Sequence, residues 1–300
     1  MEKHKRIYWK IGLDLTPEIF IEADNYHISQ RSILTQSYAF RTYGILPDTN
    51  FKISYRLNHD TIFVDELYCM AITRNGQLID VQNDVSFKGV SLSELSDDEP
   101  FYMVLNVDSF HPKSSGKEEL YAKASYSIES VGLKQKIVTG IPIMKVGYNR
   151  KKRCKEVDNN YVVPHISLST SNVLIEKYHT IKEVLSIINK KLPTNELTFY
   201  LMELLEVELN NYCLQEFPAE LILLLKKICT ILKSYLIRQN KEEFDEMKIF
   251  LNEIYNHNEI LDIVLKGIDC LKIINQKIDE KIEIIEEPVQ KAPPLILPEI

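Results

Sequence analysis

Glycine is scarce in this chain, with 9 among 300 residues. A phosphate-binding loop needs closely spaced glycines so that the backbone can approach the phosphate, and the sequence contains no such cluster. The metal-binding patterns His-Glu-x-x-His and Cys-x-x-Cys are missing too, and the 7 histidines are scattered along the chain. We therefore expect no enzyme activity, no catalytic residues, no cofactor and no metal, although the missing motifs do not exclude an unrecognised hydrolase.

Basic charge is also in short supply. The 36 Lys and Arg residues are outnumbered by 43 Asp and Glu residues, and the net charge of -7 argues against a nucleic-acid-binding surface. One basic run, Arg150–Lys155, is short and lacks interleaved aromatic residues, so it indicates a solvated loop. The 5 cysteines are odd in number and widely spaced, which is typical of reduced cysteines in a cytoplasmic protein.

Long apolar runs are missing as well. No run approaches the ~20 residues that a membrane-spanning helix requires, and the one ending at Leu225 stops at Lys226 and Lys227. The first ten residues carry charge without a following apolar segment, which argues against a secretory signal. We expect a protein that does not insert into a membrane.

What the sequence does contain changes its period near residue 165. Thr16 and Pro17 favour the start of a helix that continues to about residue 38. After it, short runs rich in Val, Ile, Tyr and Phe alternate with turn residues, a pattern typical of an antiparallel sandwich. The predicted strands are 51–55, 62–73, 78–81, 101–107, 120–128 and 137–146.

Turn signals complete this half of the chain. Asn75-Gly76 predicts a two-residue type I′ hairpin, which requires positive φ at both residues. The polar stretches 91–100 and 109–119 are expected to be exposed loops, either of which could bind a partner.

From Pro164 onward the apolar period becomes about 3.6 residues. Helices are predicted at 172–192, 194–214, 218–236 and 240–255, and a fifth after Asn258. Short joints between helices favour an antiparallel bundle. The predicted fold class is thus α+β multidomain: a β-sandwich with an N-terminal helix over 1–165, a helical bundle over 166–286 and a proline-rich tail over 287–300.

The fifth helix carries a heptad seam whose a and d positions alternate at spacings of four and three. β-Branched residues at both positions favour a trimer or a higher oligomer. The alternative is an amphipathic helix that packs against the other four helices of its own chain. The seam consists of Leu261, Val264, Ile268, Leu271, Asn275, Ile278, Ile282 and Ile285.

The opening of the chain resembles that of the TssK family, the baseplate adaptors of type VI secretion systems, which reads W-x-x-G-x-x-L-x-P-x-x-F-x-x-x-D. Later family motifs follow in order: R-x-Y-G, an N-G turn, a Val-Pro segment, and a helix start at which Phe217 replaces the usual His. The residues in step with these motifs are Trp9, Gly12, Leu15, Pro17, Phe20, Asp24, Arg41, Tyr43, Gly44, Asn75, Gly76, Val163, Pro164, Pro218 and Leu221.

This resemblance implies a non-enzymatic trimer at the cytoplasmic face of the inner membrane. In the family, a β shoulder resembling that of phage receptor-binding proteins grips extended loops of TssG in the TssF-TssG wedge, and a helical neck holds the trimer. It also implies that Trp9, Leu15, Phe20 and Tyr43 lie at the shoulder interface or in its core, and it favours the seam as the trimer contact.

Family members usually carry a further head domain that docks to the membrane complex. Here the chain continues from Glu286 into a proline-rich tail, so the component that would connect it to the membrane is unknown. An alternative of another class is a phage-tail-like trimer that binds a receptor or a carbohydrate.

Overall fold

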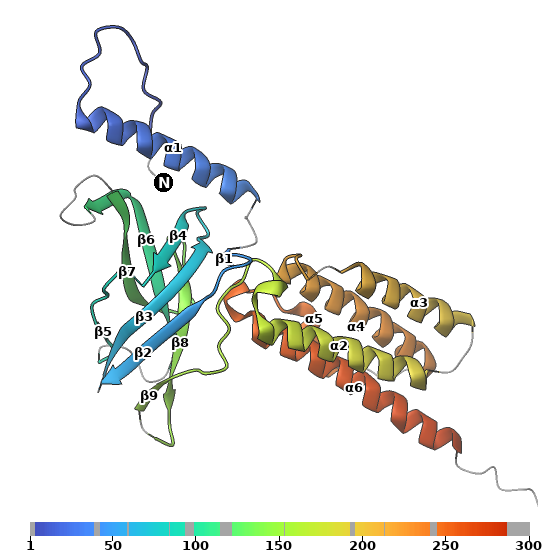
Figure 1. The fold of residues 1–300 in the computed structure, drawn as a ribbon. Coiled ribbons are helices and arrows are strands. Elements are labelled where there is room, and N and C mark those ends of the chain that lie inside the picture. Colours follow the sequence, from blue (N-terminus) through green and yellow to red (C-terminus); the bar gives the residue numbers. More distant parts are fainter. Residues whose placement is uncertain are drawn as a thin grey trace, which may run out of the picture. The chain divides into compact units, whose positions relative to one another are not determined.

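The computed structural model describes residues 4–38, 43–58, 60–83, 85–93, 99–114, 122–152, 154–192, 196–212, 214–240 and 245–286. The chain divides into two compact units, which we call the β unit and the helical unit (Figure 1). The β unit comprises Met1–Ile175, Cys213–Ile222 and Ile254–Ile263; the helical unit comprises Glu176–Tyr212, Leu223–Glu253 and Val264–Ile300. The sequence predicted a single domain boundary near residue 165. In the structure, two short segments from the later part of the chain also belong to the β unit.

The β unit contains two antiparallel sheets. In the first, β3 is central and pairs with the other four strands; in the second the order is β7-β6-β8-β9. The first sheet consists of β1 (Gly44–Ile45), β2 (Lys52–Asn58), β3 (Thr61–Ile72), β4 (Leu78–Gln82) and β5 (Val90–Ser91). The second consists of β6 (Phe101–Ser114), β7 (Ala122–Gly132), β8 (Gly140–Asn149) and β9 (Cys154–Val157).

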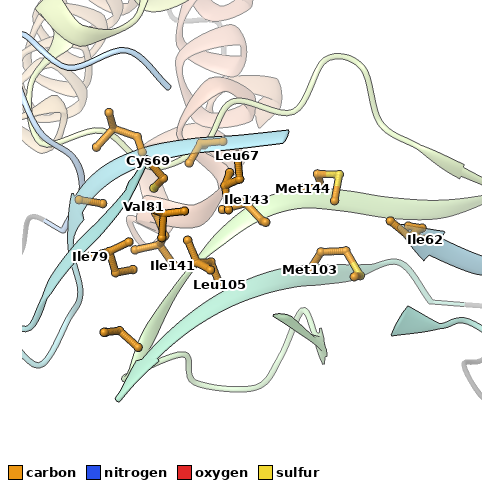
Figure 2. Close-up of a cluster of buried hydrophobic side chains, with 14 of the residues drawn as sticks. Ile62, Leu67, Cys69, Ile79, Val81, Met103, Leu105, Ile141, Ile143 and Met144 are labelled. Carbon is orange, nitrogen blue, oxygen red and sulfur yellow. The ribbon is translucent and has the colours of Figure 1, made fainter. Parts of the chain in front are cut away.

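One hydrophobic core joins the two sheets. Alternate residues of each strand point inward, as the pleat of a strand requires, and both sheets contribute to the same buried cluster. Figure 2 shows Leu67, Cys69 and Val81 of the first sheet facing Leu105 and Ile143 of the second. Burial of Cys69 raises the pKa of its thiol to about 12, so it remains a protonated core side chain.

The hairpin between β3 and β4 is not the predicted two-residue type I′ turn. Only Gly76 has a positive φ, of 80°, and the N–H of Thr73 donates to the carbonyl oxygen of Gln77 at 2.9 Å. Three residues therefore form the loop, with glycine in the left-handed position that closes such a turn. The position of the hairpin was predicted correctly, and its turn type was wrong.

Two loop predictions are also revised. The stretch 109–119 was expected to be a loop, but β6 continues through Ser114, and residues 115–119 lie outside the described residues. Of the basic run, residues 150–152 form a turn after β8 as predicted, but Cys154 and Lys155 belong to β9, and Arg153 lies outside the described residues. Lys155 is buried and its ammonium donates to the carbonyl oxygen of Leu92, so this part of the run is not a solvated loop.

Helices α1, α2 and α4 begin at the predicted proline or asparagine, which suits the first turn of a helix. The helix predicted at 240–255 is shorter than expected: α4 continues through Asn240, and α5 covers only Asp245–Asn252. In the helical unit, the Tyr178 hydroxyl of α2 donates to the carbonyl oxygen of Leu209 in α3 at 3.1 Å. A Cβ on Gly267 of α6 would lie 3.0 Å from Leu225 of α4 and from Phe250 of α5, so these three helices pack closely there. The helices are α1 (Pro17–Tyr38), α2 (Asn172–Lys191), α3 (Glu196–Asn211), α4 (Pro218–Asn240), α5 (Asp245–Asn252) and α6 (Ile260–Glu286).

Within the described parts of the chain, no helix is both long and apolar enough to cross a membrane. The described cysteines, Cys69, Cys154, Cys229 and Cys270, are free thiols.

Candidate protein-docking surface

Helix α1 reverses the usual distribution of polar and apolar residues. Its most buried side chains are Asn25, Ser29 and Ser32, which recur at helical spacing along one face. Ile33 and Leu34, by contrast, are exposed. Because the buried face is small and polar, it gains little from the hydrophobic effect, while Ile33 and Leu34 are left largely exposed.

The residues before α1 form a loop closed at its base. The carboxylate of Glu22 in α1 accepts from the backbone N–H of Lys5 at 3.1 Å and lies 3.2 Å from His4 Nδ1. The loop turns where the N–H of Leu13 donates to the carbonyl oxygen of Lys10, and Gly12 adopts a φ of 82° there. A glycine suits this left-handed conformation, which a side chain disfavours.

Large apolar side chains project from this loop and from the start of α1. Tyr8 is 83% exposed and Ile11 105%, and the Trp9 ring lies 6.2 Å from that of Phe20 with both half exposed. Exposed apolar side chains that follow one another closely in the chain, with two of their rings in contact, mark an interaction site more often than singly scattered ones do. We call Tyr8, Trp9, Ile11, Leu15 and Phe20 the N-terminal apolar surface.

Three of the four residues proposed from the sequence for partner binding, namely Trp9, Leu15 and Phe20, thus lie on this surface. Tyr43 does not, because it is only 2% exposed. As a contact for a partner, Tyr43 is a wrong prediction; as a core residue it matches the other reading of the motif.

Tyr43 anchors a segment that is remote in sequence. Its hydroxyl donates to Asn258 Oδ1 at 2.5 Å, and its carbonyl oxygen accepts from His257 Nε2 at 2.6 Å. The other ring nitrogen of His257 accepts from the hydroxyl of Tyr255. Gly44, with φ of 127°, follows directly, and a Cβ there would lie 2.1 Å from the carbonyl oxygen of Pro164. These contacts hold the 254–263 segment against β1 within the β unit.

Glu259 of the same segment forms an ion pair with Lys145 of β8. Lys145 Nζ donates to Glu259 Oε2 at 2.8 Å, and the hydroxyl of Tyr102 donates to the other carboxylate oxygen of Glu259. Burial raises the pKa of Glu259 despite these donors, and burial together with the carboxylate raises the pKa of Tyr102. The buried polar groups are paired, so we interpret this region as a structural junction and not as a catalytic site.

Two buried histidines complete the junction, which we define as Tyr43, Gly44, His165 and the 254–263 segment. Burial lowers the pKa of His165 and of His257 to about 4, and Arg74, whose guanidinium stacks 5.3 Å from the Tyr43 ring, adds to the effect on His257. Both rings are therefore neutral near pH 7. Among the described residues, no group of three or more His, Cys, Asp or Glu side chains could hold a metal ion.

The heptad seam of α6 is covered by its own chain. Val264 and Leu271 are fully buried, and Leu261, Ile268 and Ile278 are nearly so. Over Leu261–Ile278 the seam is therefore not available to a second copy in this structure, which corrects its assignment as a trimer contact. The side-chain oxygen of Asn275 is buried without a hydrogen-bond partner among the described residues, and the side chains of Ile282 and Ile285 lie outside them.

Sequence reading missed an exposed apolar stripe on α3. Tyr200, Leu204 and Val207 are half exposed and lie on one face of the helix at spacings of four and three residues. The sequence places Leu204 with Leu201, Leu205 and Leu209 in the buried stripe of this helix, and for Leu204 that prediction is wrong. Met202, Leu205 and Leu209 fill the buried face and leave Leu204 outside it.

Several solved structures have a fold similar to that of this chain. A crystal structure of TssK matches with a TM-score of 0.63 and 14% identity, over 91% of this chain and 69% of that one. A chain of the TssK-TssF-TssG baseplate subcomplex of a type VI secretion system matches with a TM-score of 0.60 and 14% identity, over 92% of this chain and 99% of that one. A chain of a type VI baseplate complex matches with a TM-score of 0.58 and 12% identity, over 92% and 100%.

No protein-family model matches the chain, and the search of curated proteins found no match either. The fold is that of TssK, as the motifs in the sequence predicted.

Proposed function

We propose that this chain is a structural, non-enzymatic component of a type VI secretion baseplate, where it binds the TssF-TssG wedge. The observation that supports this most is the match of nearly the whole chain to structures that include TssK assembled with TssF and TssG. The N-terminal apolar surface adds a site of suitable chemistry, since protein interfaces are built around exposed aromatic and aliphatic anchors.

The N-terminal apolar surface is the proposed wedge contact. Trp9 and Phe20 supply paired aromatic rings, and Tyr8 and Ile11 project beyond them. Burying two such exposed side chains contributes about 1.5–3 kcal/mol each, enough for a change of more than tenfold in affinity on loss of either one.

The test is a binding titration of the full chain with the TssF-TssG pair from the same organism. Ile11→Asp should weaken binding at least about tenfold, because it places a charge among the apolar side chains of the proposed contact. The matched control is Ile249→Asp, since Ile249 is 72% exposed and lies outside both the N-terminal apolar surface and the junction. Equal affinity of the two variants, or no binding by the unsubstituted chain, would refute the proposed contact.

Self-association into a trimer is part of the proposal, but with a different contact. The α6 seam is filled by its own chain, whereas Tyr200, Leu204 and Val207 on α3 present an apolar stripe to solvent. Three copies related by a threefold axis could bury this stripe against one another. The charged outer face of α6, with Asp269 and Lys272 exposed, is less suited to that role.

Light scattering tests this part. The unsubstituted chain should have a mass about three times 35.0 kDa. Leu204→Glu should reduce that mass to one chain, and Ile249→Glu, at an exposed isoleucine of α5, should not. A trimer that survives Leu204→Glu would exclude the α3 stripe as its contact.

The placement of the assembled protein follows from the same proposal. We expect it at the cytoplasmic face of the inner membrane, with its connection to the membrane complex made by a component yet to be identified. Affinity purification of the assembled baseplate, followed by mass spectrometry, would identify that component.

A further inference from the structure

A groove of about 700 Å³ lies between α1 and the edges of the two sheets. Ile21 and Ile28 line it from α1, and Leu78, Ala124 and Tyr126 line it from β4 and β7. Asp24, Arg31 and Asp80 supply its charged groups. A mostly apolar groove with a few polar groups is typical of a binding site, and this volume falls within the usual range for one.

One side of the groove is the free edge of β4. Among the described strands, β4 pairs only with β3. The hydrogen bonds from Thr73 N to Gln77 O and from Asn83 N to Leu67 O fix the register of this pair. In an antiparallel pair, every second residue of a strand bonds to its partner and the residues between point their N–H and carbonyl groups to the other side. In this register, Leu78 and Asp80 are residues of the second kind, so their N–H and carbonyl groups point away from β3. An edge of this kind is a template for an added strand.

The hydroxyl of Tyr126 already occupies part of this edge. It accepts from the backbone N–H of Asp80 at 3.2 Å and donates to the carbonyl oxygen of the same residue at 3.0 Å. Tyr126 belongs to β7 of the other sheet, so its side chain reaches across to satisfy both outward groups of one β4 residue. A single hydroxyl thus stands where the N–H and carbonyl of a neighbouring strand would lie.

We propose that the groove receives an extended segment of the wedge partner, about five residues long, which adds as a strand to the free edge of β4 and displaces the Tyr126 hydroxyl. The length follows from the five residues of β4 at about 3.4 Å per residue. Alternate side chains of the segment face Ile28 and Ala124, so they are apolar. The groove carries two carboxylates against one guanidinium, which favours a basic residue between the apolar ones.

A second copy of this chain fits the groove less well. Its exposed apolar residues before α1 are held in a loop by Glu22 and by the turn at Gly12, so they do not form an extended strand. The wedge partner as occupant rests on the proposed function, whereas the geometry of the free edge does not.

The experiment compares Tyr126→Phe with the unsubstituted full chain in titrations against the TssF-TssG pair. Removal of the hydroxyl frees the Asp80 peptide groups but keeps the aromatic ring, so binding should become about fivefold tighter. A structural role for the hydroxyl would weaken binding, and docking by side chains alone would leave it unchanged. Either of those results would overturn strand addition.

A second pair of variants tests the backbone itself. Leu78→Pro removes an N–H that faces the groove and leaves the bonds to β3 in place, whereas Leu78→Ala trims the side chain and keeps the N–H. We expect Leu78→Pro to bind about tenfold more weakly than Leu78→Ala. Equal affinity of these two variants would contradict the proposal.

Hydrogen exchange keeps the proposal testable if Leu78→Pro fails to fold. In the unsubstituted complex the Leu78 and Asp80 amides should exchange more slowly than in the free chain, and unchanged exchange would overturn strand addition. If the unsubstituted chain binds the wedge while all groove variants match it, this inference fails and the proposed function stands. If the unsubstituted chain does not bind the wedge, the proposed function fails, and the wedge is then also excluded as the source of the segment in the groove. Groove variants that change only self-association would assign the groove to a second copy and overturn the proposal.

Discussion

Around Tyr43 the β unit buries polar side chains in hydrogen-bonded pairs, whereas along α1 and the N-terminal loop it leaves large apolar side chains in water. The junction pairs the Tyr43 hydroxyl with Asn258 and the Tyr43 carbonyl with His257. The N-terminal apolar surface leaves Tyr8 and Ile11 almost fully exposed. A buried polar pair costs stability when it is broken, and an exposed apolar side chain costs little when it is replaced. The junction should therefore affect folding, and the N-terminal apolar surface should affect binding.

The largest expected effect is a loss of folding stability at acidic pH, which comes from the buried histidines of the junction. The pKa of His165 and of His257 is lowered to about 4 in the folded chain, against an ordinary value near 6.5 in the unfolded chain. Between these values the unfolded state binds more protons, so stability is full above about pH 6.5 and falls as the pH drops toward 4. Each histidine corresponds to on the order of 3 kcal/mol. Urea unfolding of the full chain at pH 7.5 and pH 4.5 measures this loss.

Glu259 acts in the opposite direction: its raised pKa means that the folded state takes up this proton more readily than the unfolded state, so its protonation in acid offsets part of the loss of stability. The control is His257→Gln, whose stability should fall less steeply with acid. An equally steep loss in that variant would show that His257 does not carry the effect.

Substitution at Gly44 should produce the next largest effect. Gly44→Ala forces a side chain into a left-handed conformation, with its Cβ 2.1 Å from the Pro164 carbonyl oxygen. We expect a loss of about 3 kcal/mol in the free energy of unfolding. The matched control is Gly12→Ala, because Gly12 also has positive φ but no heavy atom within 4 Å of the added Cβ. Only about 1 kcal/mol is expected there, and equal losses would mean that the close approach at Pro164 is unimportant.

Tyr43→Phe should have a smaller effect. It leaves Asn258 Oδ1 without the donor at 2.5 Å in a buried site, which costs about 1–2 kcal/mol. The measurement is the urea midpoint at constant slope. A neutral result would mean that water replaces the lost hydroxyl and that Tyr43 acts through its ring alone.

Tyr8→Ser and Leu34→Lys should have the smallest effects on stability, within about 0.5 kcal/mol, because neither side chain is covered by the β unit. Thermal unfolding measures this. A loss above 2 kcal/mol would show that these side chains pack in the folded chain. It would contradict the claim that the exposed apolar residues contribute little to folding.

Much of the fold was predictable because it depends on local pattern. The bounds of α2 and the start of α4 follow from apolar periodicity and from asparagine and proline at their starts, and the strands β2, β3, β4, β6, β7 and β8 follow from alternating apolar residues. The two-residue strand β5 was not predicted. Turn type at Asn75-Gly76 did not follow, because the same dipeptide suits both a two-residue and a three-residue loop.

The relation between distant segments was not predictable. Nothing near Asn258 indicates that it will meet Tyr43, 215 residues earlier in the chain. The seam of α6 was ambiguous for a related reason: a heptad repeat describes an apolar stripe and does not say whether a second copy or the same chain covers it. For Val264 and Leu271 the same chain does.

The surface was predictable only in part. The motif around Trp9 marked the right stretch, but α1 turns Asn25 and Ser29 inward and leaves Phe20 exposed, which an apolar-periodicity reading of the helix does not anticipate. The free edge of β4 likewise emerges only once the sheets are assembled.

Site-specific photocrosslinking in assembled baseplates tests the central claim most directly. A photoreactive residue at position 11 should crosslink this chain to TssG or TssF, and one at position 249 should not. A crosslink to the wedge from position 249 alone, or from neither position in baseplates that contain the protein, would contradict the claim that the N-terminal apolar surface binds the wedge.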